Sequence, residues 1–332
     1  MKEKNCIFAN RKRKNRSMRK VFGIGETVLD IIFRNNQPIG AYPGGSTFNA
    51  IISLGRSGVD TTFISETGAD RVGDSIIAFL QENGVNAENV RQYPGTKSPL
   101  SLAFLNEQND AEYVFYKDHP NDQIEFEYPK VNPDDIVLFG SYYALNPVIR
   151  QQVYGFLHYA HEQGAILYYD INFRAAHANE AVKLRSNLLD NLELSTIVRG
   201  SHEDFQVLYK KDDPDVLYRQ EISFYCKNFI CTRGEAPIAL RAQGNLSRSY
   251  DVEKVEAVST IGAGDNFNAG FIFGLIRENI SLMQLREGIT PEQWDRLIAY
   301  GQHFSAACCK SIFNYISPEE GERLKEKNNE DF

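Results

Sequence analysis

The chain has 332 residues, of which 42% are hydrophobic and 24% are charged, and its formal net charge is −8. This is an ordinary globular composition, and the length suits one large α/β domain or two smaller ones. Residues 1–20 hold nine Lys or Arg and one acid, which leaves a charge of −16 for the remainder. The acidic body argues against nucleic acid as the main partner, and no apolar run is long enough to span a membrane.

The two ends of the chain and the cysteines carry little chemistry. Residues 1–18 are predicted to be a disordered basic leader, or sequence upstream of a true start at Met18, although a basic arm can also bind polyanions. Residues 318–332 are expected to form a charged, frayed tail. The cysteine count is odd, with no metal-ligand spacing, and no secretory signal is visible. We therefore expect buried thiols in a cytoplasmic protein.

Strand and helix patterns alternate along most of the chain. Strands are predicted at 21–24, 62–65, 136–139, 165–169, 196–198, 229–232 and 238–240. Helices are predicted at 47–54, with Ser46 as N-cap, and at 74–82, 147–163 and 266–279. This order predicts a mostly parallel sheet with helices on both faces.

Two segments break the alternation, at about 31–43 and 98–118. The second has Leu100, Leu102 and Phe104 at every other position, then a polar turn, then Tyr113 and Phe115. Period-two patterning around a turn predicts a hairpin, and an isolated hairpin is marginal in water. We expect the two segments to form a small β-flap that serves as a lid beside the main sheet.

The most informative motif is Thr260-Ile261-Gly262-Ala263-Gly264-Asp265, which precedes a helical pattern. Small residues allow close backbone approach to an anion, and free amides at a helix start favour negative charge. Asp265 in the first turn would lie beside a bound phosphate, where it can accept a proton from an attacking alcohol. The alternative is a plain strand-to-helix turn with Asp265 as a capping carboxylate.

Five motifs stand in the order typical of one family. They are Gly25-Glu26 with Asp30, Gly44-Gly45-Ser46-Thr47-Phe48-Asn49, Gly68-Ala69-Asp70 with Gly73-Asp74, Thr232-Arg233-Gly234, and the turn ending at Asp265. Over residues 19–317 the chain resembles the ribokinase-like (PfkB) carbohydrate kinases. The resemblance implies a three-layer α/β/α sandwich with a mostly parallel central sheet and a small β-flap lid.

The resemblance also implies roles for individual residues. Asp265 would be the general base on the sugar hydroxyl, and the amides of Gly262, Ala263 and Gly264 would form the anion hole. The sugar would contact Asp30, Gly44, Gly45 and Asn49, although Asp30 and Asn49 can also be turn caps. ATP would lie near Thr232 and Gly234, with Gln302 or His303 on the adenine side.

Finer motifs resemble the fructokinase-like branch. Asp170-Ile171-Asn172-Phe173-Arg174 is similar to a strand end shared by fructokinases and 2-keto-3-deoxygluconate kinases. It implies Asp170 and Asn172 as substrate contacts, and Arg174 as a partner of the transferring phosphate or, alternatively, a structural ion pair. Phe115-Tyr116-Lys117, with Asn121-Asp122 later, resembles a fructokinase-like substrate segment that usually has Arg where Lys117 stands. Since Lys grips a carboxylate less firmly than Arg, we rank fructose above 2-keto-3-deoxygluconate.

Some positions depart from the family pattern. Ser201 replaces an amide and Asp204 a glutamate in the motif linked to the metal, and Ser259 stands where many members have aspartate. Mg²⁺ is therefore expected to be held by nucleotide phosphates, with Asp204 acting through water. These departures leave open a weakly catalytic sugar-binding regulatory homologue. Small-molecule sugar and ATP are the expected partners, and a homodimer through the β-flap is the expected assembly.

Overall fold

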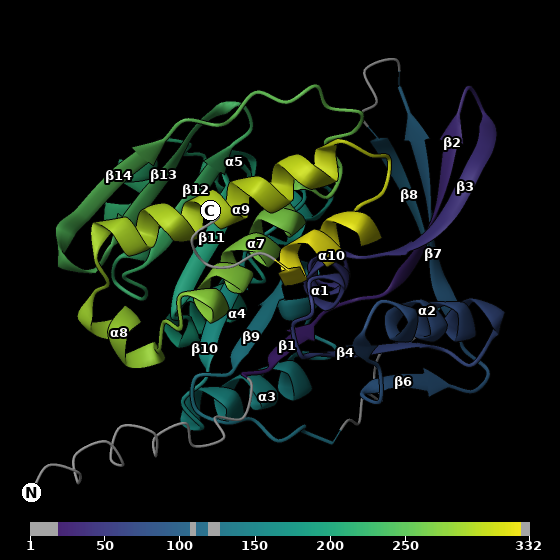
Figure 1. Cartoon of the computed structure of the whole chain (residues 1–332). Helices are drawn as coiled ribbons and strands as arrows, with labels where there is room; N and C mark the ends of the chain where they lie inside the picture. Colours follow the sequence, from purple (N-terminus) through teal and green to yellow (C-terminus); the bar gives the residue numbers. More distant parts are fainter. Residues whose placement is uncertain (1–18, 107–110, 119–126, 327–332) are drawn as a thin grey trace, which may run out of the picture.

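The computed structural model describes residues 19–106, 111–118 and 127–326 of the chain. The predicted basic leader, both candidate start methionines and the Asn121-Asp122 pair lie outside these residues. Within the described part, the chain forms one large sheet with helices on both faces and a second, smaller sheet beside it (Figure 1). The described helices include none that is long and apolar enough to cross a membrane.

The larger sheet contains ten of the described strands. Its order is β14-β13-β12-β11-β10-β9-β1-β4-β5, with β6 also paired to β4. Every neighbouring pair from β12 to β5 is parallel, whereas β13 and β14 add an antiparallel edge. The strands are β1 (Val21–Ile24), β4 (Thr61–Gly68), β5 (Val85–Asn86), β6 (Val90–Tyr93), β9 (Ile136–Gly140), β10 (Ile166–Asp170), β11 (Ile197–Ser201), β12 (Phe229–Arg233), β13 (Ala236–Ala242) and β14 (Leu246–Tyr250). Because helices cover both faces, the central strands are continuous apolar runs rather than alternating ones.

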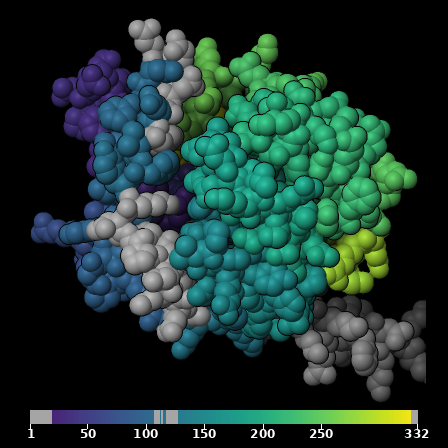
Figure 2. All heavy atoms as spheres, turned by 180° about the vertical axis from the view of Figure 1, so that it is seen from behind, coloured from purple at the N-terminus to yellow at the C-terminus, as the bar shows by residue number. Residues whose placement is uncertain are grey.

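Two separate apolar cores lie on the two faces of this sheet, which confirms the three-layer prediction. One face is covered mainly by α1 (Ser46–Arg56), α7 (Ala263–Arg277) and α9 (Pro291–Cys309), and α7 packs against both of the others (Figure 1). The other face is covered by α3 (Arg150–Glu162), α4 (Arg185–Leu194) and α5 (His202–Tyr209). In the view from behind, the teal and green middle part of the chain fills much of the surface (Figure 2). The remaining α-helices described are α2 (Arg71–Glu82), α6 (Pro214–Leu217), α8 (Leu282–Glu287) and α10 (Pro318–Glu326).

The predicted β-flap is present as a four-stranded sheet in the order β3-β2-β7-β8. Its strands are β2 (Val28–Arg34), β3 (Gln37–Gly44), β7 (Lys97–Leu105) and β8 (Ala111–Asp118). Asp70, the N-cap of α2, fastens its base: the Asp70 carboxylate accepts hydrogen bonds from the Ser98 amide (2.9 Å), the Ser98 hydroxyl (2.6 Å) and the Gly73 amide (2.9 Å). The motif from Gly68 to Gly73 therefore joins the flap to the main sheet.

Three local expectations were wrong. Gly45 rather than Ser46 is the N-cap of α1, and the Ser46 hydroxyl is directed elsewhere. Helix α3 begins at Arg150 instead of 147, because residues 146–149 form a turn. In the described part of the expected frayed tail, Pro318–Glu326 is a helix that buries Leu324, whose carbonyl accepts a hydrogen bond from Arg277 (2.6 Å). Residues 327–332 lie outside the described residues.

The prediction that the cysteines are buried thiols is confirmed where the structure describes them. Cys226, Cys231, Cys308 and Cys309 are buried and not in disulfides, while Cys6 lies outside the described residues. Burial raises the pKa of the Cys226 thiol to about 12. These four thiols are therefore protonated parts of the core.

Candidate active site

The turn before α7 is built so that only glycine fits at its first position. Gly262 is the N-cap of α7 with φ 77°, in the left-handed region that L side chains rarely adopt. A Cβ at this position would also lie 2.7 Å from the carbonyl oxygen of Asn314. Of the three amides expected in the anion hole, that of Ala263 donates within the turn to the Thr260 carbonyl (3.2 Å). The turn thus brings the positive end of the α7 dipole to the surface of the site.

Asp265 lies in the first turn of α7 and meets the start of α1. Its side chain is buried, with the residue 8% exposed. Oδ1 accepts a hydrogen bond from the Ser46 hydroxyl (2.7 Å), and Oδ2 accepts one from Asn49 Nδ2 (2.9 Å). Burial raises the pKa of Asp265 to about 6, although both hydrogen bonds oppose the rise. The carboxylate is therefore fixed in place, ionised at neutral pH and more basic than an exposed aspartate.

The side chain of Asn49 has one polar atom without a hydrogen-bond partner. Its Nδ2 is used by Asp265, whereas its Oδ1 is buried and has no hydrogen-bond partner among the described residues. A buried acceptor without a partner is costly unless a ligand supplies a donor. This observation supports the prediction that Asn49 contacts a hydroxyl group of the substrate.

Asp30 of β2 is a second buried carboxylate at this site. Oδ1 accepts a hydrogen bond from the Ser101 hydroxyl, and Oδ2 accepts one from Asn314 Nδ2 (3.4 Å). Burial raises the pKa of Asp30 to about 6 against the effect of Ser101, and the charges of Glu26 and Asp265 add to the rise. The structure therefore brings Asp30 and Asp265 close enough for each to feel the charge of the other, as a shared site requires.

The glycine pair before α1 makes room for this arrangement. A Cβ on Gly44 would lie 2.4 Å from Oδ2 of Asp30, and a Cβ on Gly45 would lie 2.4 Å from the Glu26 carbonyl oxygen. Gly45 also has φ 130°. Both residues thus permit close backbone approach at this turn. Their predicted contact with the sugar stays a prediction.

Asp170 is held by protein groups, and its predicted role as a substrate contact stays a prediction. Its carboxylate is buried at the end of β10, where Oδ1 binds Arg199 Nη1 (3.0 Å) and Oδ2 binds Asn268 Nδ2 (2.7 Å). Both oxygens are therefore already engaged below the site. Asn172 has φ 35°, and its side-chain amide is held by the Ser141 hydroxyl (3.0 Å) at the end of β9.

Arg199 is a residue that the sequence analysis missed. It is 6% exposed on β11, and its Nη2 donates to Thr232 Oγ1 (2.6 Å). Burial lowers the pKa of Arg199, but the nearby Asp170, Tyr168 and Asp204 raise it by more, so that the pKa stays above its ordinary value. A guanidinium charge is therefore buried beneath the site, next to a predicted nucleotide contact.

Arg174 and the predicted nucleotide residues lie around the rim. Arg174 is exposed, and its charge opposes the rise in the pKa of Asp265, which places it near that carboxylate. Gly234 has φ 62° in the exposed turn between β12 and β13, where nothing lies within 4 Å of an added Cβ. On α9 the ring of His303 binds Glu320 of α10 (2.8 Å), which leaves Gln302 as the stronger of the two adenine-side candidates.

The flap register corrects one predicted substrate contact. Asp30, Ser101 and Phe115 pair across neighbouring strands and share the flap face that is turned toward the site. Tyr116 pairs with Leu100, lies on the opposite face and is 57% exposed. By register, Phe115 rather than Tyr116 therefore shares the face of Asp30, although Phe115 is itself 55% exposed. The side chain of Lys117 lies outside the part of the chain that the structure describes.

Asp204 has a structural role in addition to any link with a metal. It is buried at the start of α5, where its carboxylate accepts a hydrogen bond from the Ser201 amide (2.7 Å) and the Ser201 hydroxyl accepts one from the Asp204 amide (3.1 Å). This reciprocal capping box explains why serine stands at 201. Burial raises the pKa of Asp204. Among residues 19–106, 111–118 and 127–326, no group of three or more His, Cys, Asp or Glu could hold a metal ion.

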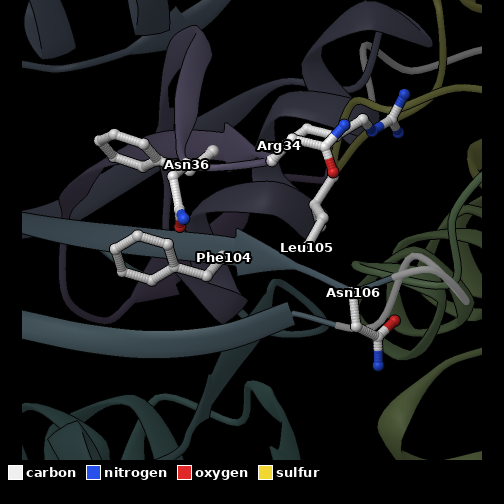
Figure 3. Close-up of a pocket in the computed structure, with 7 residues that line it drawn as sticks. Arg34, Asn36, Phe104, Leu105 and Asn106 are labelled. Carbon is white, nitrogen blue, oxygen red and sulfur yellow. The ribbon is translucent and has the colours of Figure 1, made fainter.

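A cavity of about 520 Å³ lies at the tip of the flap (Figure 3). It is lined by Phe33, Arg34, Asn35, Asn36, Phe104, Leu105 and Asn106. The rings of Phe33 and Phe104 are stacked, with centroids 5.0 Å apart. None of the predicted catalytic or substrate residues lines this cavity, so it is separate from the candidate active site.

Comparison with known proteins agrees with this geometry. The model of the family described as pfkB family carbohydrate kinase matches residues 18–314. The chain is 28% identical over 251 residues to the Arabidopsis thaliana protein named "Probable fructokinase-6, chloroplastic", a match that covers 74% of this chain and 65% of that protein. It is 26% identical over 253 residues to a 5-dehydro-2-deoxygluconokinase of Bacillus thuringiensis, a match that covers 71% of this chain and 74% of that protein.

Solved structures show the same fold. A fructokinase from Vibrio cholerae O395, in a form bound to fructose, ADP and calcium ion, gives a TM-score of 0.78 at 18% identity, covering 93% of this chain and 99% of that one. An aminoimidazole riboside kinase from Salmonella enterica, in complex with aminoimidazole riboside and an ATP analogue, gives 0.74 at 19% identity, covering 92% and 100%.

Proposed function

Since the chain belongs to the pfkB family of carbohydrate kinases, we propose that it transfers the γ-phosphoryl group of ATP to a hydroxyl group of a sugar, with fructose as the first candidate. The observation that carries this proposal is the position of Asp265. Its buried carboxylate is fixed by Ser46 and Asn49 in the first turn of a helix whose start favours an anion. A base beside a phosphate position is the arrangement that phosphoryl transfer to an alcohol needs.

The chemistry follows from these residues. The sugar hydroxyl gives its proton to the Asp265 carboxylate as its oxygen attacks the γ-phosphorus, and the bond from that phosphorus to the bridging oxygen of ADP breaks. Amides at the start of α7 and the positive end of its dipole stabilise the negative charge on the transferring group. Asp30 and the spare oxygen of Asn49 accept hydrogen bonds from the sugar and fix its orientation. Arg174 at the rim adds a positive charge near the transferring group.

Mg²⁺ fits this site as an ion carried by the nucleotide. Hard cations prefer oxygen ligands, and Mg²⁺ usually keeps several waters and binds substrate phosphates. The single candidate carboxylate, Asp204, is partly committed to capping α5, so it would act through water. When bound, the ion neutralises phosphate charge.

Neutral ketohexose remains our first choice of substrate. The side chains that hydrogen-bond to Asp30 are a hydroxyl and an amide, Ser101 and Asn314, which suit sugar hydroxyl groups. A sugar acid would bring a negative charge next to two buried carboxylates, Asp30 and Asp265. The relative that acts on 5-dehydro-2-deoxygluconate supports a sugar acid, such as that compound or 2-keto-3-deoxygluconate, as the second candidate.

A catalytically weak regulatory homologue is the competing proposal. Ser201 and Ser259, which depart from the family pattern, suggested this alternative, but both serines have structural roles in this protein. Ser201 caps α5, and the buried Ser259 accepts a hydrogen bond from the Ile261 amide (3.2 Å) just before the catalytic turn. The departures are thus compatible with an active enzyme.

The flap supports a homodimer. The face opposite Asp30 presents a mostly apolar surface, with Glu112 paired to Phe104 at its edge. Its apolar residues are Leu29, Ile31, Phe33, Leu100, Leu102, Phe104, Val114 and Tyr116. Val114 is 40% exposed, so this surface is only partly covered within the chain. A second copy of the same flap is the partner that we propose for it, because self-complementary apolar faces are typical of two-fold dimers.

The test is a coupled ADP-release assay across a panel of sugars. Fructose, 2-keto-3-deoxygluconate, 5-dehydro-2-deoxygluconate and ribose are compared at equal ATP and Mg²⁺, and the Asp265→Asn variant is the control for contaminating kinases. The highest kcat/KM is expected for fructose. A tenfold preference for either acid would reverse the ranking of substrates, and turnover with none of the sugars would favour the regulatory homologue.

A further inference from the structure

Behind the catalytic turn lies a buried polar cluster that the reaction as described does not use. It consists of Asp170, Arg199, Thr232, Asn268 and Tyr168, which are joined by hydrogen bonds from β10, β11, β12 and α7. Its centre is the ion pair between Arg199 and Asp170, whose side chains are 7% and 4% exposed. Burying an ion pair is costly, and apolar side chains of similar volume often serve stability as well or better. The pair therefore calls for a role other than stability.

Arg199 touches the backbone of the catalytic turn. A Cβ on Gly264 would lie 2.9 Å from Nη2 of Arg199 and 3.1 Å from Nη1, so the guanidinium is packed directly against this glycine. The third nitrogen, Nε, is buried and has no hydrogen-bond partner among the described residues. The guanidinium also lies over the ring of Phe267, with its carbon 6.0 Å from the ring centroid. A positive charge thus lies immediately behind the turn at Gly264.

We propose that Arg199 is a positioning residue for phosphoryl transfer: held by Asp170 and Thr232, it supports the turn at Gly264 from behind and adds positive charge at the start of α7. This inference rests on the proposed function, because it assumes that the γ-phosphoryl group lies at that turn. Asp170 forms the ion pair with Arg199, and the charge of the same carboxylate raises the pKa of Asp265. Thr232, which accepts a hydrogen bond from Arg199, links Arg199 to the side of the site where the nucleotide is expected.

The charge balance gives a signature that a merely structural ion pair lacks. The charged groups that act on Asp265 are Asp170, which raises its pKa, and Arg174, which lowers it. Asp265 in turn raises the pKa of Asp30 on the flap and of the Cys308 thiol on α9. In Arg199→Met the charge of Asp170 is uncompensated, which favours the protonated form of Asp265. In Asp170→Asn a repelling carboxylate is removed and Arg199 is left unbalanced, which favours the ionised form.

The experiment measures the acid limb of the pH profile of kcat/KM. In Arg199→Met the apparent pKa of this acid limb is expected to rise by about half to one pH unit. In Asp170→Asn it is expected to fall by a similar amount. The double variant is expected to return it toward the wild-type position. Arg199→Lys keeps the charge but not the planar fork, so its limb should stay near wild type while kcat falls. Limbs that do not move in opposite directions would overturn the proposal.

A binding measurement separates this proposal from the assignment of the reaction. By calorimetry, Arg199→Met is expected to bind a non-hydrolysable ATP analogue about tenfold more weakly, with a much smaller change for ADP, because the γ-phosphate faces the turn. Equal losses for both nucleotides, or none, would contradict the role of Arg199. Absence of turnover by the wild-type protein would instead contradict the proposed function. The binding comparison would then still decide whether Arg199 supports the γ-phosphate position. Thermal unfolding of each variant identifies any variant that fails to fold. Gly264→Ala disturbs the contact between Gly264 and Arg199 from the side of the turn.

Discussion

Replacement of Asp265 by asparagine should remove the chemistry while leaving the site intact. The variant amide can present its oxygen to Asn49 Nδ2 and donate its NH₂ group to the Ser46 hydroxyl, which can rotate to accept. Both hydrogen bonds are therefore kept. Loss of a general base costs a factor of about 10²–10⁴ in rate, or roughly 3–5 kcal/mol of transition-state stabilisation. We expect kcat to fall by this factor, with KM for the sugar changed less than threefold, an estimate that assumes little loss of uniform binding.

The same substitution should make the protein more stable at neutral pH. The pKa of Asp265 is about 6 when folded and 3.8 ordinarily, so the folded state penalises the ionised form by roughly 3 kcal/mol. Because the folded pKa is raised, the penalty is absent below pH 4, grows between pH 4 and 6, and is complete above pH 6. The variant lacks this penalty, and its advantage in unfolding free energy should appear above pH 6 and vanish near pH 4.

Two assays check this pair of expectations. Coupled ADP release gives kcat and KM at pH 8, and urea unfolding at pH 4 and pH 8 gives the free energies. Ser46→Ala is a matched control, since it removes one hydrogen bond to the base but keeps the carboxylate, and it should retain most of the activity. Turnover of Asp265→Asn within tenfold of wild type would refute the assignment of Asp265 as the base. Equal unfolding free energies of the variant and the wild type at pH 8 would refute the raised pKa of Asp265.

Three further predictions concern the flap and the metal. Asp70→Ala removes the acceptor of both Ser98 hydrogen bonds, so KM for the sugar should rise severalfold with less change in kcat, whereas Asp74→Ala in the same helix should leave KM unchanged. Hydrogen exchange at residues 98–106 should slow when saturating sugar binds, and equal exchange with and without sugar would exclude a lid. Activity should require Mg²⁺ although the nucleotide-free protein binds it poorly, so tight Mg²⁺ binding by calorimetry without nucleotide would count against an ion held by phosphates.

Sequence predicted the parts of the site that depend on local backbone geometry. The glycines at 44, 45 and 262 are needed for close approach or positive φ, and such needs leave a mark in a short motif. The alternation of strand and helix patterns likewise predicted the layers of the fold, because each element buries its own apolar face. The place of Asp265 in the first turn of a helix was predicted for the same reason.

Residues whose role depends on distant partners were missed or misplaced. Arg199 resembles any arginine in a strand until Asp170 and Gly264 are brought beside it from elsewhere in the chain. Tyr116 was placed on the substrate side because strand register, which decides the face of every side chain, cannot be read from one hairpin. Helix α10 was expected to be frayed because its sequence is mostly charged, although it buries Gly321 and Leu324.

A crystal structure of the wild-type chain with fructose and a non-hydrolysable ATP analogue tests the central claim most directly. The account predicts one sugar hydroxyl within about 2.6–3.2 Å of the Asp265 carboxylate, and the γ-phosphate at the turn of Gly262 to Gly264 with that hydroxyl in line. Asn49 Oδ1 should then accept a hydrogen bond from the sugar. A ternary complex in which no hydroxyl approaches Asp265, or in which the γ-phosphate lies away from the start of α7, would contradict it.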